Sequence, residues 1–467
     1  MGRSSPEMTP SHSDIEKGDV KHGVCSSQEK MTPQNSDLAN PPSQEEESTI
    51  IFKVPHRLRE VNEKAYEPNV ISIGPYHYRK PHLARMEGFK KRWFENFVEK
   101  PHLGIDQFRE AIRPLLEKIR NCYEQPLHLF YKDEEKFDEE KFVDMMVYDG
   151  CFVVQLIREG HLRGFWKLGQ HVSCDMRYDL LLLENQLPFF VLSTLYGMIE
   201  PNPGPEGHLY RLATSALAFF DAGPLNFNPE NTSIRHLLHL VHTTLHPSLL
   251  GILEKIERSE DNFQTSGNLI PSATEMEDAG IHFFGAPIQK MRDREQGIEN
   301  MFDIKFDKNT KKLKIPTLQV CDSTERIFRN YMAYEQLFAW EVPTFFVDYA
   351  IFIDKLINTS KDVELLRKSG IIDNLLGNDE AVTKMFNKLC NCIYYSPEGF
   401  YYNEIANQVN DHCGRRWNIL KAKLNKDYFH TPWSPISFLA ALVVLLLTIL
   451  QTIFSILSYN QQRQLDY

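Results

Sequence analysis

The sequence lacks the motifs that identify an enzyme class by themselves. It contains no GxGxxG or Walker pattern, no nucleophile elbow GxSxG, no HExxH pair and no protein-kinase set. These patterns place phosphate-binding loops, nucleophiles, zinc ligands or ATP-binding groups at a fixed spacing. The sequence therefore assigns the chain to none of these enzyme classes, and no cofactor is expected.

Paired cysteines and a basic charge balance are also missing. The eight cysteines among 467 residues form no CxxC pair, so they indicate neither a zinc framework nor a secreted disulfide scaffold. We interpret them as reduced thiols of a cytosolic protein. The net charge of −11, from 52 basic and 63 acidic residues, argues against a nucleic-acid partner, because binding domains for nucleic acids are usually basic.

Aromatic residues are absent from the first part of the chain. Residues 1–48 contain no Phe, Trp or Tyr and carry nine acidic against four basic side chains. Such a segment cannot bury enough apolar surface to offset the entropy lost on ordering. We predict a disordered acidic tail over 1–48. It is not a secretory signal, because no apolar run follows its first basic residue.

Charged residues are absent near the other end of the chain. Between Asp427 and Arg463 there is no Asp, Glu, Lys or Arg, and residues 436–457 are almost entirely apolar. At 1.5 Å rise per residue this segment is roughly 33 Å long, enough to cross a hydrocarbon layer of about 30 Å. A buried core helix is the alternative, but such helices usually carry a polar stripe. We predict a transmembrane helix over 436–457 and a short tail over 458–467.

The flanks of this helix predict its orientation. Residues 411–427 carry five basic and two acidic side chains, whereas the last ten residues carry one of each. The positive-inside rule places the N-terminal body in the cytosol, as in a tail-anchored, single-pass protein of the plasma membrane or an endomembrane. The lipid bilayer is therefore an expected partner. A polar strip of Thr448, Gln451, Thr452 and Ser455 suggests the hypothesis of a homo-oligomer.

The region between the two ends, 49–430, reads as mainly α. Apolar residues at helical spacing predict a series of helices. The expected ranges are Leu83–Lys100, with Lys90 contributing its aliphatic stem, Lys141–Arg158, Asp179–Gly197 with a break near Pro188, and about 344–358, 361–376, 379–393 and 401–424. Capping boxes predict two further helix starts, at Ser272 with Glu275, ended by Gly280, and at Asp322 with Glu325. The second of these helices is expected to carry an apolar face of Ile327, Phe328, Tyr331, Tyr334 and Phe338.

Strands are expected to be few. The pattern predicts strands over Val70–Ile73 and Ile281–Phe284, and a hairpin of Phe302–Phe306 with Lys312–Ile315. Residues 201–233 and 256–271 are rich in Pro, Gly, Asn and Ser and are predicted to be long loops, of which the second could divide two subdomains. The predicted fold is a helix-rich globular body with a minor β-hairpin, plus one C-terminal transmembrane helix.

Several short strings of the sequence resemble one known family. In order, they are Ile51–Pro55 with Leu58-Arg59, Ala65–Pro68, Ser72–His77, Met86-Glu87, Asp149–Phe152, Leu183–Pro188, Pro271–Glu275, Ala279–Ile281, Ile315-Pro316, Arg329-Asn330 with Glu335, and Pro432-Trp433. Together they resemble the plant "domain of unknown function 247" family, also called uncharacterised protein family 0481, over roughly residues 50–458. The resemblance implies a plant membrane protein with a helix-rich cytosolic or exposed domain. It also suggests a role in recognition, because grass members of the family are associated with self-incompatibility.

The string Leu183–Pro188 holds the first candidate site residues. Pro188 lacks an N–H and leaves the carbonyl of Glu184 without its helical donor. In one interpretation Asn185 and Gln186 satisfy a helix break in the core, and Glu184 is a structural anchor paired with Arg or Lys. In the other, Glu184 is a buried acid with a raised pKa that acts in a pocket. We favour the first interpretation.

Histidines and a second glutamate complete the set of candidates. His77 follows a Gly-Pro turn that lacks the glycines of a phosphate-binding loop, so structural packing is the favoured interpretation. Glu335 is a further pocket candidate. His236, His239, His242 and His246 fall within about 120° of one helical face, but zinc sites seldom take all their ligands from one helix, so no metal is expected.

Two classes of function remain open. The first is a membrane-anchored interaction or signalling protein with an unknown protein partner. The second is an enzyme with an unrecognised pocket, in which Glu184, Glu335 or His77 would be the candidate groups. The absence of any motif with its own mechanism favours the first class.

Overall fold

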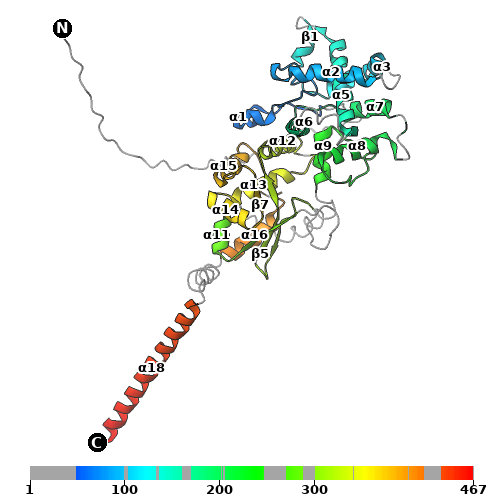
Figure 1. Ribbon diagram of the computed structural model, residues 1–467. Coiled ribbons are helices and arrows are strands. Elements are labelled where there is room, and N and C mark those ends of the chain that lie inside the picture. The colour runs from blue at the N-terminus through cyan, green and yellow to red at the C-terminus, as the bar shows by residue number, and fades with distance from the viewer. Residues whose placement is uncertain are drawn as a thin grey trace, which may run out of the picture. The chain divides into compact units, whose positions relative to one another are not determined.

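The protein is described here from a computed structural model. It describes residues 49–98, 104–132, 136–159, 170–200, 202, 206–246, 270–287, 300–339, 341–397, 399–414 and 433–465. The predicted tail over 1–48 and nearly all of the predicted division at 256–271 lie outside these residues. Within them, helices dominate and strands are short and few, which confirms the predicted mainly α fold (Figure 1).

The first half of the body is built around one long helix. Its elements are α1 (His56–Val61), η1 (Glu63–Tyr66), η2 (Pro81–Leu83), α2 (Ala84–Val98), α3 (Ile105–Ile112), η3 (Arg113–Leu115), α4 (Leu116–Asn121), η4 (His128–Phe130), β1 (Tyr131–Lys132), β2 (Lys136–Phe137), α5 (Glu139–Glu159), α6 (Gln170–Asp179), α7 (Phe189–Ile199), α8 (Gly207–Phe220) and α9 (Leu237–Leu245). Helix α5 is buried on nearly all sides between Phe142 and Ile157. Helices α2, α3, α7 and α8 pack around it.

The second half combines helices with two small sheets. Its elements are α11 (Ala273–Asp278), β3 (His282–Ala286), β4 (Lys305–Asp307), β5 (Lys312–Pro316), β6 (Leu318–Val320), α12 (Thr324–Leu337), α13 (Phe345–Leu356), α14 (Ser360–Lys368), β7 (Ile372–Asn374), α15 (Asp379–Leu389) and α16 (Asn403–Cys413). Strand β5 lies between β3, which is parallel to it, and β4, which is antiparallel. Strands β6 and β7 form a second, parallel pair.

Helix α12 joins the two halves. It packs against η1 from the first half and against α13 and α15 from the second. The predicted apolar face of this helix is confirmed for Phe328, Tyr331 and Tyr334, which are all buried. Its predicted capping box is wrong: the helix begins at Thr324 after Ser323, without a side-chain cap. The hydroxyl of Thr324 instead accepts a hydrogen bond from the N–H of Cys321.

Several predicted elements are confirmed. Helices α2, α5, α13, α15 and α16 lie within or close to their predicted ranges. The capping box of Ser272 and Glu275 opens α11, and Gly280 follows this helix with a φ of 85°, a conformation that favours glycine. The predicted hairpin forms between β4 and β5 around the Asp307 turn, whose carboxylate accepts hydrogen bonds from the N–H groups of Asn309 and Thr310.

Two predictions about the loops near the candidate site are wrong. Residues 180–188 form an irregular loop between α6 and α7, although the leucine spacing predicted a helix from Asp179. Residues 70–73 are extended but pair with no strand in the described structure. In the segment 70–73, side chains from elsewhere in the chain accept the backbone hydrogen bonds that a neighbouring strand would otherwise accept. In the loop 180–188, Gln186 of the loop itself donates to two backbone carbonyls.

Two further predicted ranges are wrong for local reasons. The helix predicted over 361–376 ends at Lys368, because Gly370 adopts a φ of 73° and turns the chain into strand β7. The loop predicted over 201–233 contains α8, whose apolar face at Leu212, Ala213 and Leu217 is buried. The Pro- and Gly-rich composition of its flanks concealed this helix.

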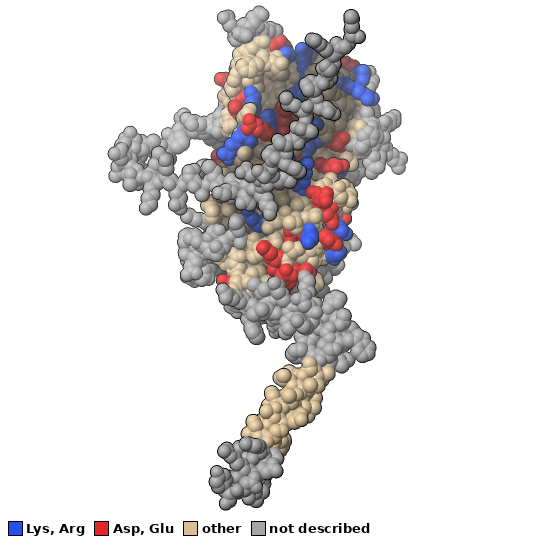
Figure 2. Space-filling view, turned by 90° about the vertical axis from the view of Figure 1, so that its left-hand side faces the viewer, with Lys and Arg blue, Asp and Glu red and all other residues tan. Residues whose placement is uncertain are grey.

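The C-terminal segment forms one long helix, α18 (Trp433–Leu465). Its part from Leu439 to Leu457, 19 residues, is long and apolar enough to cross a membrane, and none of it is buried by the rest of the chain. Figure 2 shows this part without a single Lys, Arg, Asp or Glu, in contrast to the mixed charges on the body. The described residues contain one helix of this kind.

Candidate functional site

The loop 180–188 is folded by its own side chains. The Asn185 Nδ2 group donates to the carbonyl oxygens of Asp179 (2.9 Å) and Ile71 (3.0 Å). Its Oδ1 accepts from the N–H of Ile73 at 2.7 Å. Asn185 thereby makes the backbone hydrogen bonds to residues 71 and 73 that a neighbouring strand would otherwise make. This pairing explains why that segment needs no partner strand.

Gln186 makes the corresponding contacts on the other side of the loop. Its Nε2 group donates to the carbonyl oxygens of Leu180 and Leu182, each at 2.8 Å. Its Oε1 accepts from the N–H of Leu238 in α9 at 3.2 Å. Both amide side chains are 1% exposed. The loop is therefore a largely buried turn held by these two amides rather than an open surface loop.

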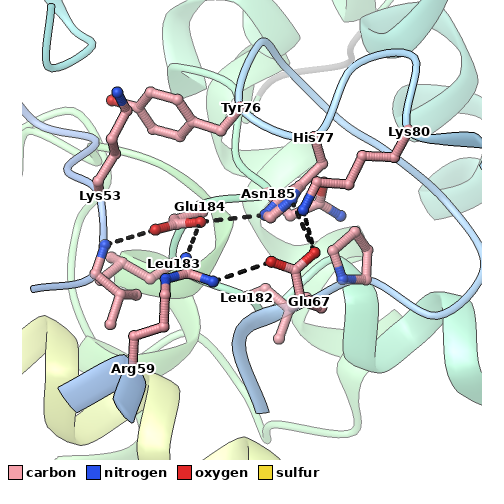
Figure 3. A network of polar contacts seen from close by, with 12 residues as sticks. Lys53, Arg59, Glu67, Tyr76, His77, Lys80, Leu182, Leu183, Glu184 and Asn185 are labelled. Atoms are coloured by element: carbon pink, nitrogen blue, oxygen red, sulfur yellow. Dashed lines mark hydrogen bonds and ion pairs between the residues drawn. The ribbon is translucent and has the colours of Figure 1, made fainter. Parts of the chain in front are cut away.

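Glu184 lies in a network of charged side chains with Arg59, Glu67 and Lys80 (Figure 3). Its Oε1 accepts from the N–H of Val54 at 2.6 Å, and its Oε2 accepts from Arg59 at 2.5 Å. The other end of the Arg59 guanidinium donates to Glu67 at 2.9 Å. Glu67 also binds Lys80. One arginine thus bridges two carboxylates that lie 117 positions apart in the sequence.

The charges of this network shift the pKa values of its members. Burial alone would lower the pKa of Arg59, but the carboxylates of Glu184 and Glu67 raise it. Burial would raise the pKa of Glu67, but its hydrogen bond to Lys80 and the charges of Lys80 and Arg59 hold it below its usual value. Both groups are therefore charged at neutral pH. Glu67 has a side-chain exposure of 26%, so the network reaches the surface there.

His77 lies between the two carboxylates. Its Nε2 is 3.4 Å from Glu184 Oε2 and its Nδ1 is 3.6 Å from Glu67 Oε2. Neither ring nitrogen has a hydrogen-bond partner among the described residues, although the side chain is 1% exposed. Burial lowers the pKa of His77 to about 3. A neutral imidazole next to two carboxylates is tolerated because Arg59 and Lys80 neutralise their charge.

A second buried ion pair lies beside this network. Lys90 of α2 and Asp149 of α5 are each 1% exposed and bind each other directly. Lys90 also donates to the carbonyl of Ser72 at 2.7 Å, and Asp149 Oδ2 accepts from the N–H of Gly74 at 2.9 Å. From the sequence, only the aliphatic stem of Lys90 was expected to be buried, and no role was expected for Asp149. A lysine on the apolar face of one helix and an aspartate within another were the signals that could have predicted the pair.

The turn at Gly74 lies directly against the backbone of the loop 180–188. Gly74 has a φ of 75°, and a Cβ atom at this position would lie 2.7 Å from the carbonyl oxygen of Gln186. Only glycine allows the segment 72–77 and the loop 180–188 to approach this closely. The same carbonyl accepts from the hydroxyl of Tyr123 at 3.0 Å.

Asp179 is a further site residue that sequence reasoning missed. Its carboxylate accepts hydrogen bonds from three consecutive N–H groups, those of Asn69 (2.9 Å), Val70 (2.7 Å) and Ile71 (2.8 Å). It also binds Arg326 of α12. A single carboxylate therefore holds the segment 69–71, which overlaps the strand predicted over Val70–Ile73.

Glu335 is not part of this network. Its carboxylate accepts from the N–H groups of Phe346 (2.9 Å) and Val347 (2.8 Å) at the start of α13 and bonds to His242 Nε2 at 2.8 Å. Glu335 and His242 are both fully buried. Burial raises the pKa of Glu335 and lowers that of His242 to about 3. The five candidate residues are thus divided between two sites, with Glu335 alone in the second.

The four histidines near α9 are engaged in contacts of their own. His236 is the N-cap of α9 and accepts from the N–H of His239, whose Nδ1 in turn accepts from the N–H of Arg235. His246 bonds to His242 at 3.0 Å. Among the described residues, no group of three or more His, Cys, Asp or Glu side chains is arranged to hold a metal ion. The histidines act here as capping and packing residues.

Three buried acids bind the N-terminal segment of the body in the same way. Glu184, Asp179 and Asp149 each accept hydrogen bonds from backbone N–H groups of the segment 54–74 and each bind a cationic side chain. Three buried acids thereby hold one N-terminal segment against the core. The strings of sequence that resembled a known family meet at this point, since 51–55, 65–68, 72–77, 149–152 and 183–188 all contribute.

Comparison with known proteins covers nearly the whole chain. A family model described as "Plant protein of unknown function", DUF247, matches residues 51–447. The chain is 31% identical to the "UPF0481 protein At3g47200" of Arabidopsis thaliana, over 90% of this chain and 88% of that protein. It is 23% identical to the "Putative UPF0481 protein At3g02645" of the same plant, over 87% of this chain and 90% of that protein. No solved structure matches the chain significantly.

Proposed function

The chain belongs to the plant DUF247 family, and from this membership we propose that it is a membrane-anchored component of protein–protein recognition or signalling. Its helix-rich body would present a surface to a protein partner, and its C-terminal helix would fix that body to a bilayer. The family itself is one of unknown function, so the proposal depends on the physical features of this chain.

One observation carries the proposal, namely the exposure of the apolar part of α18. The body covers none of the residues from Leu439 to Leu457. A soluble protein rarely leaves so large an apolar surface in contact with water. Insertion into the hydrocarbon layer of a membrane would remove this apolar surface from water. An α-helix also satisfies its own backbone hydrogen bonds there.

The charged network supports a binding role for the body rather than a catalytic one. The carboxylate oxygens of Glu184 are both occupied, one by the N–H of Val54 and one by Arg59. An acid held in this way is a structural anchor, because neither oxygen is free to exchange a proton with a substrate. The same holds for Glu335, which bonds to two backbone N–H groups and His242.

A second candidate function has one observation in its favour. Both ring nitrogens of His77 lack a hydrogen-bond partner among the described residues, and the adjacent Glu67 is partly exposed. An enzyme that uses a buried carboxylate beside an uncharged histidine would have this arrangement. It would require a substrate to enter past Glu67 and Lys80.

The charge distribution favours a cytosolic body. Five basic residues precede the helix within 411–427, against two acidic residues, and basic residues accumulate on the cytosolic side of membrane spans. Asn231 and Asn358 begin Asn-x-Ser triplets and are both exposed, so they would be accessible for glycosylation if the body lay in the lumen.

A topology experiment tests the anchor. The full chain with an N-terminal tag would be expressed in plant cells, and its membranes would be extracted with alkaline carbonate and treated with protease. We expect the chain to stay in the membrane pellet, the tag to be digested without detergent, and glycosidase to leave the mobility unchanged. A chain without residues 433–465 should be released. Release of the intact chain by carbonate would disprove the anchor, and glycans on Asn231 or Asn358 would reverse the orientation.

A second experiment distinguishes the two functions. Proximity labelling with the full chain would be compared with a control in which residues 433–467 alone anchor the labelling enzyme. Proteins labelled only by the full chain and recovered with it after purification would support recognition. A metabolite bound to the purified chain, and lost in a His77→Phe variant, would support the enzyme instead.

A further inference from the structure

The exposed part of α18 has two different faces. Small or polar side chains recur at seven-residue intervals at Ala441, Thr448 and Ser455, with Val444 and Gln451 three residues after the first two. The other faces are formed by large apolar side chains, namely Leu442, Val443, Leu446, Leu447, Ile449, Leu450, Ile453, Phe454, Ile456 and Leu457. We define the polar face of α18 as Ala441, Val444, Thr448, Gln451 and Ser455.

Gln451 distinguishes this face from a simple run of small residues. The hydroxyls of Thr448 and Thr452 donate back to the carbonyl oxygens of Val444 and Thr448, each at 2.8 Å, so both threonines are satisfied within the helix. The described residues provide no such partner for the Gln451 amide, which is exposed. This amide lies three residues from the midpoint of the span Leu439–Leu457, about 4.5 Å along the helix axis. It would therefore lie deep in hydrocarbon, where an amide needs a hydrogen-bond partner.

We propose that the polar face of α18 binds the same face of a second copy of this chain, forming a parallel dimer in the membrane. This inference rests on the proposed membrane anchoring. In a parallel pair the two Gln451 side chains lie at the same depth without any further adjustment. Each amide has both a donor and an acceptor, so two of them bond reciprocally. A partner of different sequence would need a polar group at that same depth.

The spacing of the face determines the geometry of the pair. A seven-residue repeat corresponds to 3.5 residues per turn, which produces a left-handed crossing of two helices. Small side chains at Ala441, Thr448 and Ser455 let the two backbones approach closely, as membrane helix pairs require. The bulky side chains of the other faces then contact lipid. The described residues contain one helix able to span a membrane, and the proposed partner is the same helix of a second copy.

Cysteine crosslinking in membranes tests the dimer on the full chain. Helix α18 contains no cysteine, so single cysteines can report its contacts. Variants Ala441→Cys, Thr448→Cys and Ser455→Cys should form disulfide-linked dimers under mild oxidation, whereas Leu446→Cys and Ile453→Cys on the opposite face should not. The chain without an added cysteine corrects for the exposed Cys174 and Cys392 of the body. Equal crosslinking at all five positions, or none at any, would overturn the proposal.

A second set of variants tests the role of the amide. In the Thr448→Cys background, Gln451→Leu should lower the dimer-to-monomer ratio by about sevenfold, as expected for the loss of two reciprocal interhelical hydrogen bonds. Gln451→Asn should retain dimerisation, and Thr452→Val is the control, because that hydroxyl is already bonded within its own helix. An unchanged ratio for Gln451→Leu would refute the amide contact. Crosslinks only to proteins of other mass would refute the second copy as the partner.

Carbonate extraction of every variant separates the two proposals. If the chain stays in the membrane pellet but does not crosslink along the polar face, the dimer is wrong and the anchor stands. If the chain is extracted, both are wrong.

Discussion

The backbone N–H of Val54 donates a hydrogen bond to Glu184 Oε1 over 2.6 Å, although 130 positions of sequence separate the two residues. Glu184 Oε2 simultaneously binds Arg59. This carboxylate therefore connects the first described segment of the chain to the loop before α7. Its removal should affect the stability of the whole body.

We expect Glu184→Ala to lower the free energy of unfolding by about 3 kcal/mol, because it leaves a buried N–H and a partly buried guanidinium without their partner. Glu140→Ala is the matched control, since Glu140 forms an exposed pair with Arg113 and should cost less than about 1 kcal/mol. Urea unfolding of the detergent-solubilised chain measures both. Equal losses for the two variants would show that Glu184 is not an anchor.

The buried Glu335 leads to a second prediction. Glu335→Gln replaces one carboxylate oxygen by an NH₂ group, which then faces the backbone N–H of Phe346 or of Val347. One buried donor then lacks an acceptor, at a cost of about 1–3 kcal/mol.

Glu341→Gln provides the comparison for Glu335→Gln. Glu341 follows the same helix, but it is exposed and pairs with Arg235, so its substitution should cost less than about 1 kcal/mol. Thermal unfolding of the two variants side by side would test this difference. A Glu335→Gln variant as stable as Glu341→Gln would contradict the hydrogen-bond pattern of the second site.

Asp348 predicts a pH dependence of stability. Burial and the nearby Glu335 raise the pKa of Asp348 to about 8, and the N–H of Tyr401 opposes this only in part. The folded chain therefore holds a proton that the unfolded chain releases. This contribution to stability is complete below about pH 4 and is lost as pH rises towards 8, by up to about 1.4 kcal/mol per pH unit.

Asp348→Asn should remove that pH dependence while still accepting the hydrogen bond from Tyr401. The free energy of unfolding of the variant minus that of the parent chain should therefore be larger at pH 8 than at pH 4. Asp411→Asn, on the exposed side of α16, controls for the loss of a carboxyl group. Unfolding curves between pH 4 and pH 8 with parallel slopes for Asp348→Asn and the parent would contradict the prediction.

Substitution of two glycines by alanine should change the stability of the body in opposite directions. A Cβ atom on Gly285 in β3 would lie 1.9 Å from the carbonyl oxygen of Gly370, whereas one on Gly88 in α2 would meet nothing within 4 Å. Gly285→Ala should destabilise the body by about 2 kcal/mol or more, because β3 and the backbone at Gly370 must separate. Gly88→Ala should stabilise it by about 0.5–1 kcal/mol through helix propensity. Thermal unfolding should thus shift in opposite directions, and a shared direction would be inconsistent with this packing.

The sequence predicts those parts of the fold that depend on local chemistry. The capping box at Ser272, the hairpin around Asp307 and the buried face of α12 each follow from residues within a few positions of one another. Backbone hydrogen bonds in these elements come from neighbours in the chain. Hydrophobic periodicity and turn residues are therefore sufficient to predict these elements.

The loop 180–188 and the segment 69–73 could not be predicted in this way. Leu180, Leu183 and Leu187 have helical spacing, but the carbonyl of Leu180 is bonded to the side chain of Gln186 instead of a helical N–H. The N–H groups of 69–71 are bonded to Asp179, about 110 positions away. A single sequence contains no signal for a contact at that distance.

The candidate site was also predicted only in part, because its contacts join residues that lie far apart in the sequence. The strings around His77 and Glu184 indicated that these residues matter, and the structure brings them within 3.4 Å. The identity of the cation beside Glu184 depends on which of many basic residues folds next to it, and that is Arg59. Asp179, Lys90 and Asp149 were missed, because a buried charge is recognised only when its partner is in place.

The long separations within the network also determine when the N-terminal segment can fold during synthesis. At roughly 5–20 residues per second, the ribosome needs about 5–20 s after Asn69 to reach Asp179, which binds that segment. Asn330, which donates to the carbonyl of Ala65 from 265 positions away, follows only after about 13–53 s. Until then the apolar side chains of Ile71 and Ile73 remain available to chaperones. Since α18 is synthesised after both of these partners, the N-terminal segment can bind them before the hydrophobic helix that would target the chain to a membrane has been made.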